Sequence, residues 1–194
     1  MSACDDTDMH DRIRLRPATV EDAPALAAIY NPYIVETVIS FEMEPVPVEQ
    51  MGARVAKVLD AGLPWIVAED VDVVTDLGEH APDAVVGFAY AGPFQERAAY
   101  DHSLEVTVYL REGETGRGVG TELYGALLEL IAELPSTSKH SPAHALYSRI
   151  ALPNDASVAL HERFGFSRVG TFSEVGRKQD RWIDVGIWEL LLED

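Results

Sequence analysis

Glu105 is a candidate catalytic residue because of its place in the sequence. It lies in an otherwise apolar, strand-like run, where alternation puts it on one face with Thr107 and Tyr109. A carboxylate at such a position is costly to bury unless it is paired or functional, and a functional one suits the role of general base. Spacing alone favours the plainer alternative, a solvent-facing glutamate on a half-exposed strand.

A glycine-rich turn follows that strand and opens into an amphipathic helix; it reads Gly116-Arg117-Gly118-Val119-Gly120-Thr121. It is not a Walker A loop, because no Lys-Ser/Thr pair follows, and it lacks the third glycine of the dinucleotide fingerprint. A helix N-terminus leaves backbone N–H groups free and favours an anion. The turn therefore predicts a pyrophosphate site, with Arg117 adding a charge-assisted contact, although a simple connection explains the turn alone equally well.

His161 lies in a third segment, Ala151 to Phe166, where Asn154 is the expected N-cap of a short helix ending at Phe164-Gly165. Histidine can transfer protons near neutral pH, but a lone helical histidine is more often a surface residue. His140 and His144 are four residues apart, yet Ser141-Pro142 breaks any helix between them. No metal site is expected.

The elements that must position these residues follow from periodicity and turn signals. The order of strands and helices, without internal repeats, predicts one α/β domain over residues 12–194 after an acidic tail, residues 1–11. A helix after Thr19 should break between Pro32 and Ile39, and Asp70 to Asp83 should be a long hairpin loop. A further helix is expected over Val48–Leu59. The helix after the turn should have one apolar face, made of Val119, Leu123, Leu127, Leu130, Ile131 and Leu134. The expected strands are Ile13–Arg16, Trp65–Glu69, Val85–Ala91, His102–Leu110, His144–Ile150, Ser167–Ser173 and Trp182–Leu192.

The amino-acid composition argues against some classes of protein, in particular those that bind nucleic acid or anionic membranes. The chain has 194 residues, 33 acidic and 15 basic, for a formal net charge of −18. Nucleic acid and anionic membrane are poor partners for such a chain, since both need a basic face. A single cysteine, Cys4, and the absence of a signal-like apolar run suit the cytoplasm. Only three of the basic residues are lysines, and an acidic, lysine-poor surface favours a protein that works in high salt over an ordinary acidic one.

The segment from Ala151 to Phe166 resembles motif B of the GNAT acetyltransferase superfamily, and Leu104 to Leu134 resembles its motif A. Four shorter runs are similar to the phosphinothricin and methionine sulfoximine N-acetyltransferase subfamily: Ala89-Tyr90-Ala91-Gly92-Pro93, Arg97-Ala98-Ala99-Tyr100-Asp101, Leu152-Pro153-Asn154-Asp155 and Asp184-Val185-Gly186-Ile187-Trp188. The resemblance covers about Ile13 to Leu192 and thins over Asp70–Asp83 and Pro135–Tyr147.

This resemblance implies a role for each candidate residue. Glu105 would be the general base for the substrate amine, and His161 would transfer a proton, either to the leaving CoA thiolate or within the base relay. Acetyl-CoA would be held by Asn154, by the backbone of Val108, Tyr109 and Leu110, and by the turn Thr115, Gly116, Arg117, Gly118, Val119 and Gly120. Thr115 departs from the Gln or Arg usual at its position. The substrate would meet Phe41, Arg97, Tyr100, Glu105 and Thr107, with Arg97 and Tyr100 at the subfamily's carboxylate site.

The fold implied is a single GNAT-like α/β domain with a mixed, mostly antiparallel sheet flanked by helices, its strands splayed to admit CoA. The activity implied is acetyl transfer from acetyl-CoA to the α-amine of a small amino-acid-like substrate, in a homodimer and without a metal. Two alternatives stay open: a non-catalytic CoA-binding sensor, and an acetyltransferase acting on protein amines.

Overall fold

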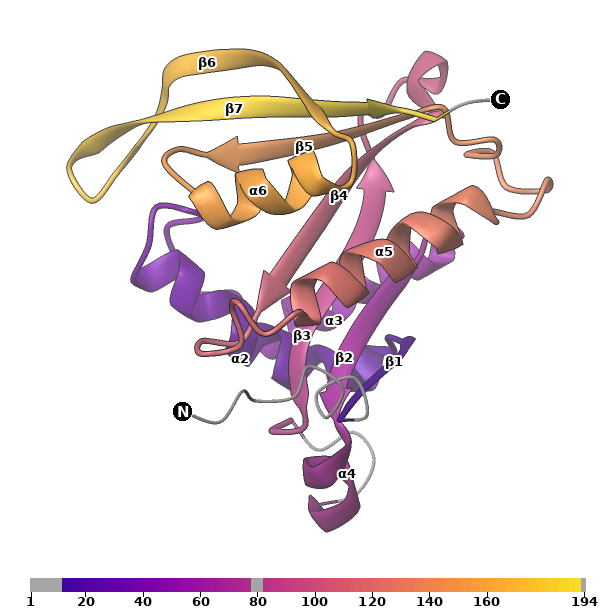
Figure 1. Cartoon of the computed structure of the whole chain (residues 1–194), viewed down its shortest axis with the longest axis vertical. Coiled ribbons are helices and arrows are strands. Elements are labelled where there is room, and N and C mark those ends of the chain that lie inside the picture. Colours follow the sequence, from indigo (N-terminus) through magenta and orange to yellow (C-terminus); the bar gives the residue numbers. More distant parts are fainter. Residues whose placement is uncertain (1–11, 78–81, 193–194) are drawn as a thin grey trace, which may run out of the picture.

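The computed structural model describes residues 12–77 and 82–192, which form one seven-stranded sheet flanked by helices (Figure 1). The strand order is β1-β2-β3-β4-β5-β7-β6. The expected tail, residues 1–11 with Cys4, lies outside the described residues. In chain order the elements are β1 Ile13–Pro17, the 3₁₀ turn η1 Val20–Asp22, α2 Ala23–Val35, α3 Val48–Asp60, β2 Trp65–Asp70, α4 Val71–Leu77, β3 Val85–Pro93, the 3₁₀ turn η2 Ala98–Tyr100, β4 Ser103–Leu110, α5 Val119–Ala132, β5 Ala145–Ala151, α6 Asp155–Arg163, β6 Ser167–Lys178 and β7 Arg181–Leu191.

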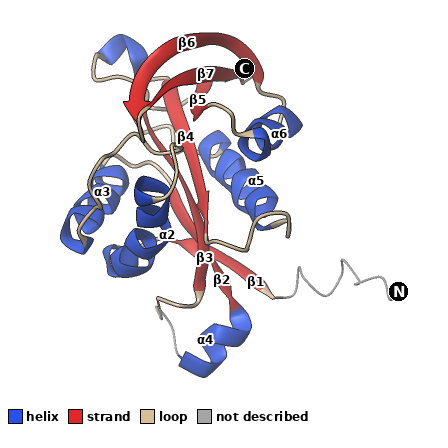
Figure 2. Ribbon diagram, turned by 90° about the vertical axis from the view of Figure 1, so that its left-hand side faces the viewer, coloured by secondary structure: helices blue, strands red, loops and turns tan. Residues whose placement is uncertain are grey.

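The sheet separates two layers of helices, with α2 and α3 on one face and α5 and α6 on the other (Figure 2). Tyr109 of β4 packs edge-on against Tyr30 and Tyr33 of α2, with ring centroids 4.9 and 5.0 Å apart. Because alternate residues of a strand share a face, Glu105 and Thr107 lie on the α2 side as well. The other face of β4 is apolar, as the alternation predicts; Leu104 and Val106 are buried, and Val108 and Leu110 are partly buried.

The strands β4 and β5 are parallel and pair over only three residues, Ser103–Glu105 with Ala145–Tyr147. The other neighbouring strands of the described sheet are antiparallel and pair over longer stretches. Beyond Glu105, β4 continues to Leu110 paired with β3 alone among the described strands. The expected mostly antiparallel sheet and the expected opening between these two strands are both confirmed.

The helix α2 ends at Val35, within the range where a break was expected, but it passes through Pro32. Proline removes one helical hydrogen bond, and here the last turn is held in other ways. The N–H of Glu36 donates to the Pro32 carbonyl at 2.8 Å. Ile34 is 1% exposed and the Tyr33 hydroxyl donates to the Leu110 carbonyl at 2.7 Å, so packing against the sheet keeps the turn helical.

The expectation of a loop from Asp70 to Asp83 is wrong in its first half, because Val71–Leu77 form α4. The Asp70 carboxylate accepts a hydrogen bond from the N–H of Asp72 at 3.0 Å, near the start of this helix. The segment is rich in β-branched valine and too short to show helical periodicity, so its residues carry no helix signal.

The expected apolar face of α5 needs two corrections. The helix ends at Ala132, so Leu134 lies beyond it and is only partly buried. Leu130 is 40% exposed, whereas Tyr124, which the sequence did not single out, is fully buried. The ring of Tyr124 packs against His161, Phe164 and Phe166, with centroids 4.9 to 5.8 Å apart. The buried stripe of α5 is therefore rotated toward α6, and it becomes part of the support for His161.

Candidate active site

A cleft of about 1420 Å³ is lined by β4, β5, the glycine turn, α6 and the loop after α2. It brings together most residues that the sequence singled out. Among the expected site residues, its wall contains Phe41, Glu105, Thr107, Val108, Tyr109, Leu110, Thr115, Gly116, Arg117, Gly118, Gly120, Asn154 and His161. Val119 is 1% exposed in the core, and Arg97 and Tyr100 do not line the cleft.

The glycine turn lines part of the cleft. Gly116 and Gly118 have φ of +82° and +86°, in the left-handed region that side chains disfavour, and a Cβ on either would meet nothing within 4 Å. Within the described chain, the N–H groups of Val119 and Gly120 donate to no carbonyl, since the first bonds of α5 run from Thr121 and Glu122 to Gly118. Open backbone and free amides at the start of a 14-residue helix suit an anion.

The charge of Arg117 is already paired in this structure. Its Nη1 donates to both carboxylate oxygens of Glu114, at 2.9 and 2.7 Å. An anion bound at the turn would therefore have to compete with Glu114 for the guanidinium. The backbone amides, rather than Arg117, are the hydrogen-bond donors available to an anion.

Glu105 is paired with Arg149, a residue that the sequence did not flag. The Arg149 Nε donates to one carboxylate oxygen at 2.8 Å and its Nη2 to the other. The Glu105 side chain is 24% exposed and that of Arg149 50%. The bond to Glu105 raises the pKa of the Arg149 guanidinium, against the opposite effect of burial. Glu105 is thus neither the solvated glutamate of the plainer alternative nor an unpaired buried base.

His161 is buried, 2% exposed, on α6. Its Nδ1 lies 2.7 Å from the Ser157 carbonyl, and because a carbonyl only accepts, Nδ1 carries the proton. Burial lowers the pKa of His161 from 6.5, and the bond to Ser157 opposes this only in part. The ring is therefore neutral at pH 7, and Nε2, which has no partner among the described residues, is a proton acceptor.

The start of α6 is built as expected. The Asn154 side-chain oxygen accepts a hydrogen bond from the Ser157 N–H at 3.2 Å, so Asn154 is the N-cap. Because Oδ1 of Asn154 accepts the cap bond, the Nδ2 group of Asn154 is the one left to donate to a ligand in the cleft. This cap fixes the first turn of α6, and with it the carbonyl of Ser157 that sets the His161 tautomer.

The wall of the cleft on the α2 side is held by the end of the β6–β7 hairpin. The Lys178 ammonium donates to the Ser40 carbonyl at 2.5 Å, and the ring of Phe41 lies directly against Gly176. The neighbouring Glu42 accepts two hydrogen bonds from Arg54, at 2.6 and 3.0 Å. The bonds to Arg54 lower the pKa of Glu42 despite its partial burial, so this second carboxylate of the cleft is ionised.

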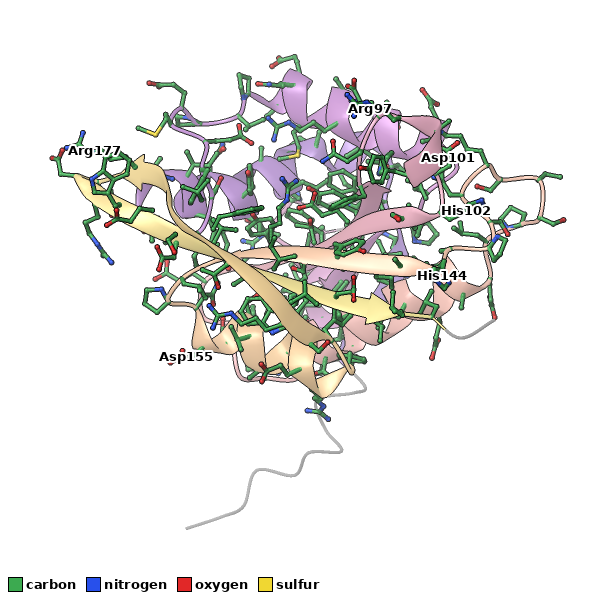
Figure 3. The ribbon with its side chains drawn as sticks, turned by 90° about the horizontal axis from the view of Figure 1, so that it is seen from above. Arg97, Asp101, His102, His144, Asp155 and Arg177 are labelled. Atoms are coloured by element: carbon green, nitrogen blue, oxygen red, sulfur yellow. The ribbon has the colours of Figure 1, made fainter. Side chains whose placement is uncertain are left out.

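Arg97 and Tyr100 lie where β3 connects to β4, and both are exposed. Figure 3 shows Arg97 and Asp101 on one side of the molecule and Asp155, the first residue of α6, on the opposite side. Phe94 packs edge-on against Tyr100 at 5.8 Å. Within one chain, these two residues are not brought to the cleft that holds Glu105 and His161.

Metal ligands do not gather in the part of the chain that the structure describes, where no group of three His, Cys, Asp or Glu side chains could hold an ion. His140 is fully buried, and its Nδ1 lies 2.7 Å from the Asp101 carbonyl. The residues of the cleft instead fit an extended, anionic cofactor, because the cleft is lined both by the turn with the free amides and by the part of β4 that is not paired with β5.

Comparison with known proteins agrees with this geometry. Residues 12–167 match the family model described as an acetyltransferase (GNAT) domain. The chain is 36% identical over 183 residues to a phosphinothricin N-acetyltransferase of Streptomyces coelicolor, covering 91% of this chain and 95% of the relative. It is 30% identical over 179 residues to an L-methionine sulfoximine/L-methionine sulfone acetyltransferase of Pseudomonas aeruginosa, covering 92% and 94%.

Solved structures carry the same fold. A phosphinothricin acetyltransferase from Sinorhizobium meliloti, solved in complex with AcCoA, is similar with a TM-score of 0.81 and 27% identity, over 93% of this chain and 89% of that one. A ribosomal-protein-alanine N-acetyltransferase from Brucella melitensis is similar with a TM-score of 0.78 and 32% identity, over 92% and 99%. These relatives share acetyl transfer to an amine but differ in the amine.

Proposed function

The chain belongs to the GNAT acetyltransferase family, and on that premise we propose that it transfers the acetyl group of acetyl-CoA to the α-amine of a small amino-acid-like substrate. One observation carries the proposal. A single cleft is lined by the glycine turn with its free backbone amides, by a carboxylate on β4 and by a neutral histidine on α6.

Acetyl-CoA would lie along the opening between β4 and β5. The amides of Val119 and Gly120 would hold the pyrophosphate, with Thr115, Gly116, Arg117 and Gly118 around it. Along Val108, Tyr109 and Leu110 the pantetheine arm would pair with β4 as an added strand does, through the backbone groups that point away from β3. The carbonyl of Leu110 already accepts from Tyr33, so its N–H is the group left for this pairing. Asn154 would reach the cofactor through Nδ2.

The chemistry requires the substrate amine to lose two protons. Glu105 would take the first from the ammonium, which makes the nitrogen a nucleophile. A backbone N–H of β4 would polarise the thioester carbonyl. His161, neutral and with a free Nε2, would take the second proton as the amide forms and return it to the thiolate. His161 would therefore act first as an acceptor and only then as a donor.

The substrate would bind on the α2 side, against Phe41, Thr107 and Glu105. Arg97 and Tyr100, proposed from the resemblance, could contact it only if the connection between β3 and β4 moves or a second copy of the chain supplies them. We also propose a homodimer, supported by exposed apolar side chains on β6 and β7, namely Val169, Phe172, Val175 and Trp182. Light scattering after size-exclusion chromatography tests it; a single species of 21.3 kDa would exclude it.

Release of free CoA thiol, followed with phosphinothricin, methionine sulfoximine, methionine sulfone and other amino acids, tests the activity. Glu105→Gln should lower kcat roughly 10²- to 10⁴-fold while calorimetric binding of acetyl-CoA stays unchanged. The exposed Glu96→Gln is the matched control and should be silent. Unchanged turnover in Glu105→Gln would remove this residue as the base.

The same assay separates the two alternatives. A CoA-binding sensor would bind acetyl-CoA without releasing thiol for any amine. An enzyme for protein amines would acetylate peptides with free N-termini or lysines and leave the free amino acids untouched. The similarity to a ribosomal-protein-alanine N-acetyltransferase makes an alanine-starting peptide a necessary member of the panel.

The working environment is a further proposal. No helix in the described part of the chain could span a bilayer. We propose a cytoplasmic protein whose net charge of −18 is tolerated because salt screens it. Cell fractionation tests the location. Unfolding measured against KCl tests the adaptation, which fails if molar salt adds no stability.

A further inference from the structure

Arg149 bridges the mouth of the opening between β4 and β5. The register pairs Glu105 with Tyr147, so Arg149 lies two residues further along β5, on the same face and beyond the last residue paired with β4. Its guanidinium reaches back across the opening to both oxygens of Glu105. Any amine that approaches Glu105 from the cleft must therefore meet this ion pair.

The fold has little need of this contact. Half of the Arg149 side chain is exposed, and an ion pair at such a site adds little to stability. β5 is held through its full length by β7, from Ala145 to Ala151. The pair also carries a cost for catalysis, since it occupies the carboxylate that the substrate ammonium must reach.

We propose that Arg149 is the receptor for the substrate α-carboxylate, and that a zwitterionic amino acid binds by exchange with the Arg149–Glu105 ion pair. This proposal rests on the acetyl transfer proposed above. The substrate ammonium replaces the guanidinium on Glu105, and its carboxylate replaces Glu105 on Arg149. One ion pair becomes two, with no change in net charge, and Glu105 is freed to accept the proton.

The geometry selects the α-carboxylate rather than an anion further along the substrate. Arg149 and Glu105 are in direct hydrogen-bond contact, so an anion that binds Arg149 must lie close to the ammonium that binds Glu105. In an α-amino acid the two charged groups are attached to the same carbon. The planar fork of arginine suits bidentate binding of a carboxylate. A simple amine offers no anion to exchange, and it would have to break the pair without replacing it.

The test compares L-methionine sulfone with its α-carboxamide, which has the same side chain and an amine but no carboxylate charge. The wild type should prefer the acid by roughly 100-fold in kcat/KM, and Arg149→Gln should reduce this preference to roughly threefold, mainly by losing activity on the acid. Arg149→Lys, which keeps the charge without the fork, should fall between them. The exposed Arg181→Gln should keep the wild-type preference.

Two results would overturn the proposal. One is an acid preference that survives in Arg149→Gln. The other is an equal loss for acid and amide, because Arg149 would then merely position Glu105. Calorimetric binding of both compounds to CoA-loaded protein gives the same comparison without turnover. If no amine is acetylated but the acid still binds through Arg149, the proposed function fails, whereas the binding of the α-carboxylate by Arg149 stands.

Discussion

Gly176→Ala tests whether the wall at Phe41 contacts the substrate. A Cβ at Gly176 would lie 2.2 Å from Cε2 of the Phe41 ring and within 2.8 Å of two further ring atoms. The shortest normal carbon–carbon contact is about 3.5 Å, so the ring must retreat by roughly 1.3 Å. Phe41 is 42% exposed and can move, and Gly176 lies outside the left-handed region, so the fold should tolerate the methyl group.

The expected effect falls on the amine alone. A gap of this size forfeits at least half of each van der Waals contact, which for a half-buried ring with on the order of 20 contacts is about 1 kcal/mol. That corresponds to a roughly fivefold lower kcat/KM for the amino acid, with unchanged binding of acetyl-CoA. Gly170→Ala, on the same strand and with nothing within 4 Å of its Cβ, is the matched control.

A double-mutant cycle decides whether the effect passes through Phe41. In the Phe41→Ala background there is no ring to displace, so adding Gly176→Ala should change kcat/KM no further. Thermal unfolding and thiol release are measured for all four proteins. The reasoning is refuted if Gly176→Ala lowers kcat/KM by the same factor with and without the ring, or if it weakens acetyl-CoA binding.

Three other outcomes are expected. Glu69 is fully buried and bonded to Arg16 at 2.8 Å and to a second arginine; burial alone would raise its pKa, but these bonds outweigh burial and hold the pKa below 4.5. Its contribution to stability is therefore present above pH 4.5 and is lost as the pH falls through the lower pKa of the folded state. Glu69→Gln should cost about 3–5 kcal/mol in urea unfolding at pH 7 and flatten the loss of stability at acid pH. Gly118→Ala and Gly113→Ala, both at a φ of +86°, should each cost about 1 kcal/mol of stability, but calorimetry should find weaker acetyl-CoA binding only for Gly118→Ala. The kcat of the wild type should fall as the pH drops through a value below 6.5, where His161 takes up a proton, and this limb should be missing from the residual activity of His161→Asn.

The face on which Glu105 lies and the helix cap at Asn154 could both be predicted from the sequence, because each depends on residues close together in the chain. Strand alternation puts Glu105, Thr107 and Tyr109 on one face, and the cap bond spans three residues, from Asn154 to Ser157. Local rules of this kind gave the sheet elements and the helix starts. They failed at α4, where seven residues are too few to show a period.

The pairing of Glu105 with Arg149 could not be read from the sequence, since it joins residues 44 positions apart. A charged residue in a buried strand was a signal, but its meaning depends on the register that sets Tyr147 beside Glu105. The burial of Tyr124 has the same origin, because α6 decides which edge of α5 is covered. The resemblance supplied roles for Arg97 and Tyr100 but no position relative to the cleft.

The three-residue joint between β4 and β5 has a consequence for the life of the protein in a cell. It leaves the sheet as two blocks, which side chains also join, among them the ring of Tyr124 against Phe164, the bridge from Arg149 and the bond from Lys178 to the Ser40 carbonyl. A donor molecule lying in the gap would bind both blocks at once, and at 100 times its Kd it would add about 2.7 kcal/mol against their separation. Proteases that cut the separated form would then clear the enzyme faster when acetyl-CoA is scarce, so the supply of donor would set the amount of catalyst as well as its rate.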